Sequence, residues 1–445
     1  MVVASIDLQG GKVVQLRQGT ELVLQRDNAL ELAEEFDRYG EVAVIDLDAA
    51  AGRGSNLEMI KPLLRKAECR VGGGIRSPKQ ARELVSLGAK KIILGSGAFR
   101  NPAKKGAGIG GGEFGVNTEF LEAVSGEIGR ERVIAAVDAR NGEIVVDGWK
   151  TPTGLDLIGA AKAAEPYVSE LLFTCVEREG SLTGIDLEPV RKLREAVSCL
   201  ITVAGGVSCL EEIGALSALG CDVQLGMALY TGRVNLAEAF VRGLDWKKGA
   251  CPPGSAAAES SGAGCPALLP VIVQSPGGQV LMTAFADREA LRETFARGNV
   301  CFYSRRRGGL WMKGESSGNT LRLVRLRADC DRDAILALAE PAGPVCHTGS
   351  WSCFALDRQY TWELLQSIVA GRLRNPVPGS YTASLDDGLV REKVMEEAGE
   401  VCSAGTRDEI VREAADLFYF TTVLMTRAGV TTAEVLDELD RRHKK

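Results

Sequence analysis

Two aspartates at equivalent positions of an internal repeat could form an acid–base pair. Asp7 ends the apolar segment VVASID, and Asp138 ends the similar segment VIAAVD, 131 residues later. Carboxyl groups in different environments can act as general acid and general base in one proton-transfer reaction. Either aspartate alone could simply cap a turn, but their symmetric placement favours one shared catalytic site.

Glycine-containing turns follow four other apolar segments of the same repeat. Backbone N–H groups in such turns, with the N-terminus of a following helix, can bind phosphate, although glycine can also be needed there for steric reasons alone. The turns form two pairs related by the repeat, which predicts one long ligand with a phosphate at each end. The turn residues are Gly73, Gly74, Gly95 and Ser96 in the first half and Gly205, Gly206, Gly226 and Met227 in the second.

Three aspartates alternate with other residues in the segment DCDRD. In an extended strand, Asp329, Asp331 and Asp333 would point to one face, because side chains of a strand alternate between faces. Three adjacent carboxylates repel one another unless a hard cation lies among them, which indicates Mg²⁺. A polar turn without a metal is the alternative.

Three cysteines of the same region could bind zinc. Cys330, Cys346 and Cys353 have no Cys-x-x-Cys spacing, yet three thiolates can hold Zn²⁺ and leave a fourth position for water. Buried structural thiols are the alternative for Cys346 and Cys353. His347 follows one of these cysteines and is a candidate base, or a residue that only supports local hydrogen bonding.

Two pairs of acidic residues lie in helical patterns near the C-terminus. Glu397 with Glu400, and Glu413 with Asp416, are each three residues apart and so share a helix face. If the two helices pack antiparallel, the four carboxylates can converge on Mg²⁺. A solvated acidic face is the alternative.

Composition limits the kinds of site that the chain can build. The 445 residues are 45% hydrophobic and 25% charged, as in globular proteins, and the net charge of −6 argues against a nucleic-acid-binding surface. Only two histidines are present, so metals must be held by thiolates or carboxylates. No export signal or apolar run of roughly 18–20 residues is found. We therefore expect a cytoplasmic protein without a membrane or nucleic-acid partner.

The repeat that carries the aspartates predicts a barrel. Each half contains four short apolar runs separated by helical patterns, and the segment from Val71 matches the segment from Val203 at nearly the same period. Eight strand–helix units within residues 1–248 fit a (β/α)8 TIM barrel, whose active site lies at the C-terminal ends of the strands. An open doubly wound sheet explains the symmetry less well.

Two further units follow the barrel. Residues 249–266 are rich in Gly, Ala, Ser and Pro and are predicted to be a flexible linker. Residues 267–356 are strand-like and rich in turns, which predicts a small β-rich α+β domain. Residues 357–445 show helical periodicity and predict an all-α domain.

The first unit resembles the phosphoribosylformimino-aminoimidazole-carboxamide ribotide isomerase of histidine biosynthesis, through IDLQGGKVV, DLDAAAGRGSN, VGGGIRS, VDARNGEIVVDGW, AGGVS and GMALYTG. The resemblance implies a metal-free Amadori rearrangement of a bisphosphorylated aminoaldose. It implies that Asp7 is the general base, that Asp138 is the general acid and that Thr174 contacts the substrate.

The first unit departs from the family pattern in three places. Gln15 replaces a basic residue, and Cys175 and Glu179 replace two aspartates of the motif TDxxRDG. The glycine-rich segment Lys104–Gly115 is an altered loop. The alternatives are a barrel that only binds phosphoribosyl ligands or supports a dimer, and a dual isomerase that also accepts phosphoribosylanthranilate.

The second unit resembles phosphoribosyl-AMP cyclohydrolase through PGGQVLMTAFADREAL, FYSRRRGGLWMKGESSGN, RADCDRDA and CHTGSWSCF. That family opens the purine ring. The resemblance implies Mg²⁺ on the three aspartates, and Zn²⁺ on Cys346 and Cys353 with Cys330 of a second subunit, and therefore a homodimer through this domain. Candidate phosphate contacts are Arg305, Arg306, Arg307 and Lys313.

The third unit resembles phosphoribosyl-ATP pyrophosphohydrolase, an all-α MazG-like fold, through NPVPGSYTASLDDGLVREKVMEEAGEV and EIVREAADLFYFTTVLMTRAGV. The resemblance implies Mg²⁺-dependent release of pyrophosphate, with Lys393 as a candidate phosphate contact. Together, the three resemblances predict a fused histidine-biosynthesis enzyme whose substrates are phosphoribosyl nucleotides.

Overall fold

The computed structural model describes residues 1–100, 114–249, 266–355, 357–377 and 379–443. The chain forms two compact units: one comprises Met1–Val273 with Thr283–Gly343, and the other comprises Gln274–Met282 with Pro344–Lys445. The interior of the predicted linker, and the predicted altered loop up to residue 113, lie outside the described residues.

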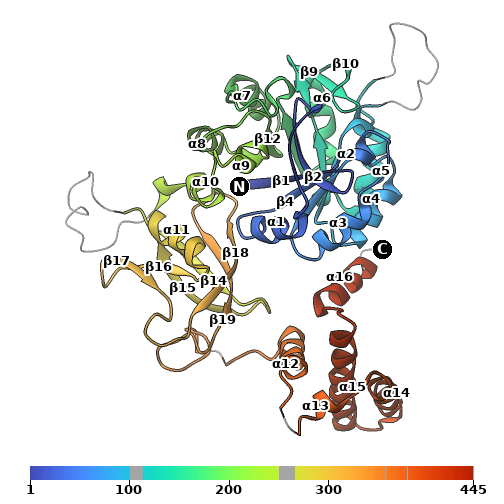
Figure 1. The fold of residues 1–445 in the computed structure, drawn as a ribbon, viewed down its shortest axis with the longest axis vertical. Helices are drawn as coiled ribbons and strands as arrows, with labels where there is room; N and C mark the ends of the chain where they lie inside the picture. Colours follow the sequence, from blue (N-terminus) through green and yellow to red (C-terminus); the bar gives the residue numbers. More distant parts are fainter. Residues whose placement is uncertain (101–113, 250–265, 356, 378, 444–445) are drawn as a thin grey trace. The chain divides into compact units, whose positions relative to one another are not determined.

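Eight parallel strands close into a barrel in the N-terminal part of the chain (Figure 1). The first and last strands pair in parallel, with Ala4 opposite Leu225, and this pairing closes the ring. The TIM barrel is therefore confirmed, and the open sheet is wrong. The strands are β1 (Val2–Gln9), β4 (Val42–Asp46), β5 (Cys69–Gly72), β6 (Lys91–Leu94), β7 (Val133–Ala136), β11 (Glu170–Thr174), β12 (Leu200–Ala204) and β13 (Asp222–Leu225).

Amphipathic helices surround the strands, and polar residues cap several of them. Ser77 accepts a hydrogen bond from Gln80 N at the start of α4, where Pro78 takes the first helical position, and Asp156 caps α6 in the same way. The main helices are α1 (Ala29–Phe36), α3 (Leu57–Leu64), α4 (Pro78–Ser86), α5 (Thr118–Ile128), α6 (Leu157–Ala164), α7 (Leu187–Ala196), α8 (Leu210–Ala218) and α10 (Leu236–Gly243).

Short elements decorate the C-terminal ends of the barrel strands. These ends carry the loops that form an active site in this fold. The elements are the hairpin strands β2 (Lys12–Arg17) and β3 (Glu21–Arg26), the three-stranded sheet β8 (Ala139–Arg140), β9 (Glu143–Val146) and β10 (Thr151–Asp156), the short helices α2 (Leu47–Ala50) and α9 (Met227–Tyr230), and the 3-10 turns η1 (Ser96–Phe99) and η5 (Val176–Arg178). The turns η3 (Arg130–Arg132), η4 (Glu165–Tyr167) and η6 (Trp246–Lys248) lie elsewhere.

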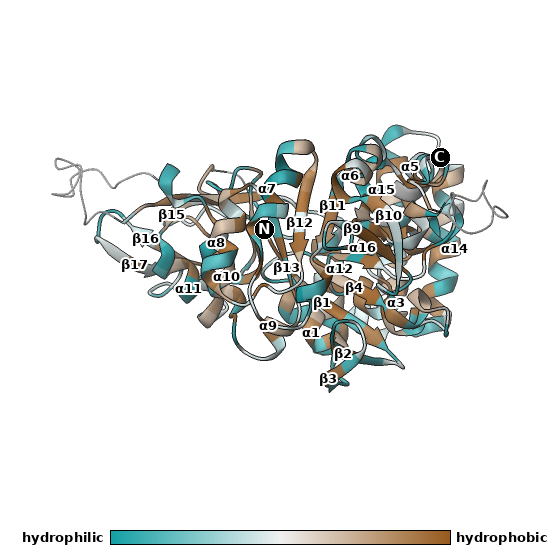
Figure 2. Ribbon diagram, turned by 90° about the horizontal axis from the view of Figure 1, so that it is seen from above, coloured by the Kyte–Doolittle hydropathy of each residue, from teal (hydrophilic) through white to brown (hydrophobic). Residues whose placement is uncertain are grey.

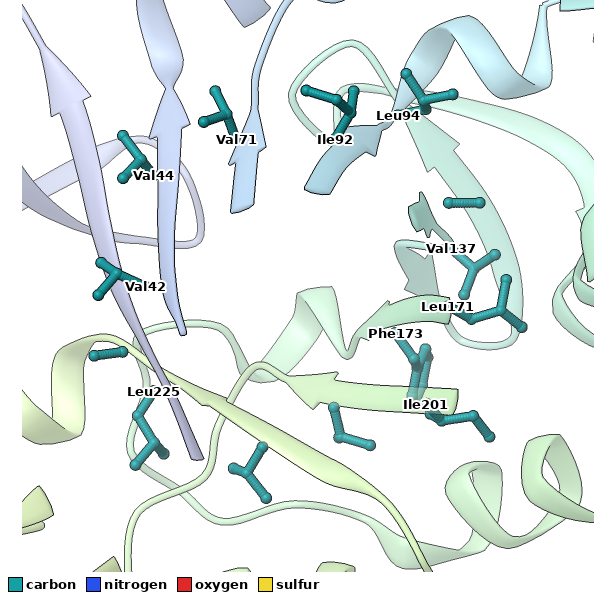
Figure 3. Close-up of a cluster of buried hydrophobic side chains, with 14 of the residues drawn as sticks. Val42, Val44, Val71, Ile92, Leu94, Val137, Leu171, Phe173, Ile201 and Leu225 are labelled. Carbon is teal, nitrogen blue, oxygen red and sulfur yellow. The ribbon is translucent and has the colours of Figure 1, made fainter. Parts of the chain in front are cut away.

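Alternation along the strands divides the buried side chains of the barrel into two layers. Ile92 and Leu94 belong to the large cluster that packs under the helices, whereas Ile93 between them belongs to a small cluster inside the ring. Figure 3 shows outer-layer side chains around the ring of strands. In Figure 2, strand β12 is mostly hydrophobic, whereas the helices alternate between hydrophobic and hydrophilic residues.

An ion cluster lies inside the barrel at the N-terminal ends of the strands. Arg70 on β5 is fully buried and forms ion pairs with Glu170 on β11 and with Glu41. Lys91 on β6 lies 3.0 Å from a Glu170 oxygen, and Thr202 on β12 donates a hydrogen bond to the same carboxylate. Burial alone would raise the pKa of Glu170, but Arg70 and Lys91 lower it to about 2.

Small sheets and one helix follow the barrel, which agrees with the predicted mixed α+β fold of this region. Its four-stranded sheet has the order β15-β14-β19-β18, and a separate hairpin pairs β16 with β17. The elements are β14 (Leu269–Gln274), β15 (Val280–Ala286), α11 (Arg288–Arg297), β16 (Cys301–Ser304), β17 (Gly309–Met312), β18 (Leu321–Ala328) and β19 (Ile335–Pro341).

The C-terminal region is helical, as predicted. Thr406 and Glu409 form a reciprocal capping box at the start of α15, and Val369, Val390 and Val423 contribute to the helical core. No helix within the described part of the chain is long and apolar enough to cross a membrane. The helices are α12 (Trp362–Arg374), α13 (Tyr381–Ser384), α14 (Asp387–Ser403), α15 (Arg407–Arg427) and α16 (Thr432–His443).

Candidate functional site

One pocket of about 720 Å³ opens at the C-terminal ends of the barrel strands. It brings together every acid, base and phosphate-binding residue that the sequence predicts for the barrel. These residues are Asp7, Asp138, Thr174, Gly73, Gly74, Gly95, Ser96, Gly205, Gly206, Gly226 and Met227. Residues more than 200 positions apart therefore form one site, at the end of the barrel where the fold places its chemistry.

The glycines of two of these turns are required by close backbone packing. Gly73 has φ +103°, and a Cβ atom there would collide with the carbonyl oxygen of Asp46. Gly205 has φ +86°, and its Cβ would lie 2.5 Å from the carbonyl oxygen of Cys175. The same packing thus occurs in both halves of the barrel. It leaves main-chain groups of both turns facing the pocket without side chains above them.

Asp7 lies on β1, two residues before the strand ends, with its carboxyl group in the pocket. Ser5, on the same face of the strand, donates a hydrogen bond to Asp7 Oδ1 at 2.7 Å. Burial raises the pKa of Asp7 to about 6, although the hydrogen bond from Ser5 acts in the opposite direction. A carboxylate with this pKa is ionised at neutral pH and still basic enough to accept a proton.

Asp138 follows β7 and is held by two donors. Trp149, in the turn between β9 and β10, donates its indole N–H to Asp138 Oδ2 at 2.9 Å. Burial raises the pKa of Asp138, while hydrogen bonds from Thr174 and Trp149 lower it. The predicted substrate contact Thr174 is therefore also a partner of the predicted acid. Gly19 makes room for this arrangement, because a Cβ atom there would lie 2.9 Å from the Trp149 ring.

Glu179 adds a third carboxyl group to the pocket. Burial raises its pKa to about 8, and the charges of Asp7 and Asp138 raise it in the same direction. Glu179 is therefore protonated at neutral pH, because its ionisation would place a further charge near Asp7 and Asp138. The sequence shows only that Glu179 replaces an aspartate of the family motif. Its raised pKa results from burial and from its distances to Asp7 and Asp138 in the folded barrel.

The three aspartates near residue 330 lie in a tight turn between β18 and β19, so their predicted extended strand is wrong. Asp329 Oδ1 accepts hydrogen bonds from Asp333 N at 3.0 Å and Ala334 N at 3.1 Å, which closes the turn. One oxygen of each of Asp329, Asp331 and Asp333 lies within 4.8 Å of the others. Such a set of hard oxygen donors fits Mg²⁺.

The candidate zinc ligands Cys346 and Cys353 lie in the segment after β19. Thr348 donates its hydroxyl to Cys346 Sγ at 3.1 Å, and the contacts from Thr348 lower the pKa of Cys346. His347 Nδ1 lies 3.8 Å from the same sulfur. Cys330 is exposed in the aspartate turn. Cys346 is half-buried, and a cysteine thiolate is a preferred ligand of zinc, so the chemistry of this side chain fits a metal ligand.

The C-terminal helices bring three of the four predicted acids together. Glu397 on α14 and Glu413 and Asp416 on α15 each offer an oxygen within 4.8 Å of the others. Glu400 lies outside this group but hydrogen-bonds to Glu413, and burial together with Glu400 raises the pKa of Glu413. The short connection between α14 and α15 makes the two helices antiparallel, which produces this convergence.

Family models match three consecutive parts of the chain. The model "Histidine biosynthesis protein" matches residues 1–235, "Phosphoribosyl-AMP cyclohydrolase" matches residues 282–355, and "Phosphoribosyl-ATP pyrophosphohydrolase" matches residues 363–443. The first match covers more than half of the chain. The chain belongs to the histidine biosynthesis protein family. It is an enzyme that joins an isomerase domain to cyclohydrolase and pyrophosphohydrolase domains.

Relatives of the histidine biosynthesis family match the chain in two parts. A phosphoribosyl imidazole-4-carboxamide isomerase of Methanosphaera stadtmanae is 35% identical over 249 residues, which cover 54% of this chain and 98% of that protein. The histidine biosynthesis bifunctional protein HisIE of Pyrococcus furiosus is 42% identical over 194 residues, which cover 40% of this chain and 92% of that protein. The chain therefore resembles a fusion of these two kinds of protein.

Two departures from the family pattern lie away from the pocket surface. Gln15 is buried behind the turn of Gly226 and donates to Val14 O at 3.0 Å, and Arg17 pairs with Glu21. Cys175 is a buried thiol whose pKa burial raises to about 12, so it carries no charge at neutral pH.

Basic residues that the sequence analysis did not select also line the barrel pocket. They are Arg53, Arg76 and Lys150, from loops after β4, β5 and β9. Arg76 bridges two turns, because it donates to Ala49 O at 3.2 Å and Gly74 O at 3.3 Å. Their sequence signal is weak, since isolated surface arginines and lysines are common.

The other predicted phosphate contacts have varied surroundings. Arg305 stacks on Phe285 with the guanidinium carbon 4.4 Å from the ring centre, and Arg307 pairs with Glu315. Arg306 is exposed and Lys313 is buried. Lys393 lies 2.6 Å from Glu396 on the same helix. The phosphate-binding role of these four cyclohydrolase residues and of Lys393 stays a prediction.

Proposed function

We propose that this chain catalyses three consecutive steps of histidine biosynthesis. It hydrolyses phosphoribosyl-ATP to phosphoribosyl-AMP and pyrophosphate, opens the purine ring by cyclohydrolysis, and isomerises the resulting bisphosphorylated aminoaldose to the aminoketose. The order of the domains along the chain is the reverse of the order of the reactions. The observation that carries the proposal is that one barrel pocket contains all the acid, base and phosphate-binding residues predicted for the barrel. The family matches of the two following regions support the two hydrolase steps.

In the isomerase reaction, Asp138 acts as general acid and Asp7 as general base. Opening of the sugar ring requires a proton on the ring oxygen, and formation of the ketose requires removal of the proton from C2. Asp138, oriented by Trp149 and Thr174, donates the first proton, and Asp7, ionised at neutral pH, accepts the second. Glu179 remains neutral below about pH 8 and adds no charge that would repel the substrate.

The two phosphates of the substrate bind at opposite sides of the pocket. Main-chain N–H groups of the turns at Gly73–Gly74 and Gly95–Ser96 bind one, and those at Gly205–Gly206 and Gly226–Met227 bind the other. This arrangement selects a ligand with a phosphate at each end, because each pair of turns supplies a separate anion site.

The cyclohydrolase uses two kinds of metal ligand. Asp329, Asp331 and Asp333 hold Mg²⁺, and Cys346 and Cys353 hold Zn²⁺ together with Cys330 of a second subunit, which makes the enzyme a homodimer through this domain. When bound, zinc would acidify a coordinated water molecule. We assign to His347, whose Nδ1 lies 3.8 Å from Cys346 Sγ, the role of accepting a proton from water or of orienting it.

The pyrophosphohydrolase uses the acids of α14 and α15. Glu397, Glu413 and Asp416 hold Mg²⁺, with Glu400 as a neighbour of Glu413. When bound, Mg²⁺ would neutralise charge on the triphosphate and position it. The helices supply the geometry, since residues three positions apart share one face of each.

Two alternatives concern the barrel. It could be a non-catalytic module that binds phosphoribosyl ligands or supports a dimer, or a dual isomerase that also acts on phosphoribosylanthranilate. Asp7 and Glu179 are buried carboxyl groups with raised pKa values. They favour a catalytic barrel, because such values are typical of acid–base sites. An assay with phosphoribosylanthranilate as substrate distinguishes an isomerase that serves only histidine biosynthesis from a dual isomerase.

The decisive experiment follows intermediates through the purified full-length chain. With phosphoribosyl-ATP, Mg²⁺ and Zn²⁺, the parent should form the aminoketose without lasting accumulation of an intermediate. Asp7→Asn and Asp138→Asn should each stop the sequence at the aminoaldose. Formation of the aminoketose by both variants, or accumulation of the aminoaldose by the parent, would disprove the barrel assignment and leave the two hydrolase assignments intact.

A further inference from the structure

The aspartate turn of the cyclohydrolase is bound to the barrel through Arg332. Its guanidinium donates to Ser217 O at 3.0 Å, Cys221 O at 2.9 Å and Asp222 Oδ1 at 2.8 Å. The backbone N–H of Asp245 donates to Arg332 O at 2.8 Å. Because Asp222 begins β13, these contacts lie at the N-terminal end of the barrel, opposite the isomerase pocket.

The backbone of Arg332 has an uncommon conformation. Its φ is +63°, in the left-handed region that residues other than glycine seldom adopt. The residue is flanked by Asp331 and Asp333. Contacts at both the side chain and the carbonyl of Arg332 maintain this conformation, so the barrel fixes the direction in which the flanking carboxylates point.

The strand that leads into the turn is attached to the same end of the barrel. Arg325 and Arg327 on β18 form ion pairs with Glu68 at 2.5 and 2.8 Å, and both also pair with Asp37. Leu326 N donates to the carbonyl oxygen of Arg38 at 3.0 Å. Because β18 ends at Ala328, this attachment continues directly into Asp329.

Lys248, at the end of the barrel segment, forms ion pairs with two of the three aspartates. Lys248 Nζ is 2.6 Å from Asp331 Oδ2 and 3.3 Å from Asp333 Oδ2. An ammonium group at these oxygens reduces the repulsion between the two carboxylates. It also uses lone pairs that a divalent cation would need, so the two cations compete for the same atoms.

We propose that the isomerase barrel sets the divalent-cation affinity of the cyclohydrolase. Arg332 is a positioning residue that holds the aspartate turn in a conformation able to bind the cation, and Lys248 is a competitor that weakens binding. Fusion with the barrel thus supplies part of the surroundings of a metal site in the next domain. This inference rests on the proposed Mg²⁺ role of Asp329, Asp331 and Asp333.

The test measures Mn²⁺ affinity by electron paramagnetic resonance on the full-length, zinc-saturated protein. All proteins carry Glu413→Gln, which weakens the carboxylate group of the C-terminal helices. Lys248→Ala should tighten binding by about fivefold, which corresponds to loss of an exposed ion pair. Arg332→Ala should weaken binding by about tenfold, as expected for loss of a group that orients metal ligands.

Matched variants separate these effects from general changes of charge. Lys247→Ala removes a neighbouring exposed lysine, and Arg322→Ala removes an arginine of β18 that pairs within its own domain, with Glu340. Both should leave Mn²⁺ affinity unchanged. Isomerase activity, measured in each variant, should stay at the parental level because the barrel pocket lies at the other end of the strands.

The outcomes distinguish this inference from the proposed function. If Asp331→Asn lowers Mn²⁺ affinity but Lys248→Ala and Arg332→Ala do not change it, the metal site stands and the barrel does not control it. If Asp331→Asn leaves Mn²⁺ affinity unchanged, both the magnesium assignment and this inference are wrong. Because Lys248 is exposed, its variant tests the inference even if Arg332→Ala destabilises the fold.

Discussion

Trp149 and Asp138 are joined by a hydrogen bond of 2.9 Å between the indole N–H and the carboxylate. The tryptophan comes from the turn after β9, and the aspartate follows β7, so a decorating hairpin orients the acid of the barrel pocket. Trp149 holds a left-handed conformation with φ +66°, next to Asp147 at +57° and Gly148 at +64°. These conformations form the tight turn that directs the Trp149 ring toward Asp138.

Replacing Trp149 with Phe should impair the isomerase while retaining most of the ring's packing. Asp138 becomes charged as it donates its proton, and a hydrogen bond to a charged group contributes about 1.5–3 kcal/mol, so kcat/KM for isomerisation should fall about tenfold or more. Because the N–H lowers the pKa of Asp138, its loss should move the pKa governed by this group upward in the pH profile. Steady-state kinetics from pH 5 to 9 would measure both effects.

The control variant Trp311→Phe, in the cyclohydrolase region, should change neither kcat/KM nor the pH profile of the isomerase. Parental kinetics of Trp149→Phe would contradict the role of the hydrogen bond.

Glu179 should impose an alkaline limit on isomerase activity. Its pKa of about 8 means that it ionises above that pH and adds charge beside Asp7 and the anionic substrate. Glu179→Gln should therefore remove the decline of kcat/KM near pH 8. The exposed neighbour Glu177, changed to Gln, should retain it. An unchanged alkaline limb in Glu179→Gln would show that another group is responsible.

The same pKa predicts a pH dependence of stability. Between about pH 4.5, where the carboxyl ionises in the unfolded chain, and pH 8, the folded state binds more protons, so stability falls as pH rises. Glu179→Gln removes this loss. Its melting temperature should exceed that of the parent at pH 8, and the difference should shrink toward pH 5 when both are followed by calorimetry. A constant difference across this range would contradict the prediction.

Arg70 should be important for stability of the barrel. Arg70→Met leaves Glu170 buried without its main partner, and breaking such a pair costs about 3–5 kcal/mol. Chemical denaturation monitored by loss of isomerase activity would measure the change. Arg82→Met breaks an exposed pair with Glu127 and should cost less than about 1 kcal/mol.

The ion cluster around Arg70 also predicts a loss of stability in acid. Since the pKa of Glu170 in the folded protein is about 2, the contribution of the cluster to the free energy of unfolding should be lost as pH falls from 4.5 toward 2.

Metal analysis should find about one zinc per chain, in the proportion expected for one three-thiolate site per protomer of a symmetric dimer. Cys346→Ser should lose this zinc and the cyclohydrolase activity, because a hydroxyl is a poor replacement for a thiolate. The exposed Cys402 on α14, changed to Ser, should retain both. A fully active cyclohydrolase without zinc would contradict the assignment.

Much of the fold and many site candidates could be predicted from local patterns. Apolar runs of strand length, a repeat of about 131 residues and the carboxylate spacing on helices depend on neighbours along the chain. These patterns predict the barrel and many, but not all, of its pocket-lining residues. The aspartate segment was different. Its alternation suggested a strand, but the hairpin between β18 and β19 needs a turn there, which local alternation does not reveal.

The sequence by itself determined which residue types are available for chemistry: carboxylates, thiolates and glycine turns, with almost no histidine, in three consecutive modules. Tertiary structure alone decided how those groups behave. Glu179 titrates near pH 8 only because folding removes water and places Asp7 and Asp138 nearby, and Arg332 and Lys248 reach their partners only through the packing of the aspartate turn on the barrel. Desolvation and Coulomb interactions depend on distances between residues far apart in the chain, and these distances are set by folding.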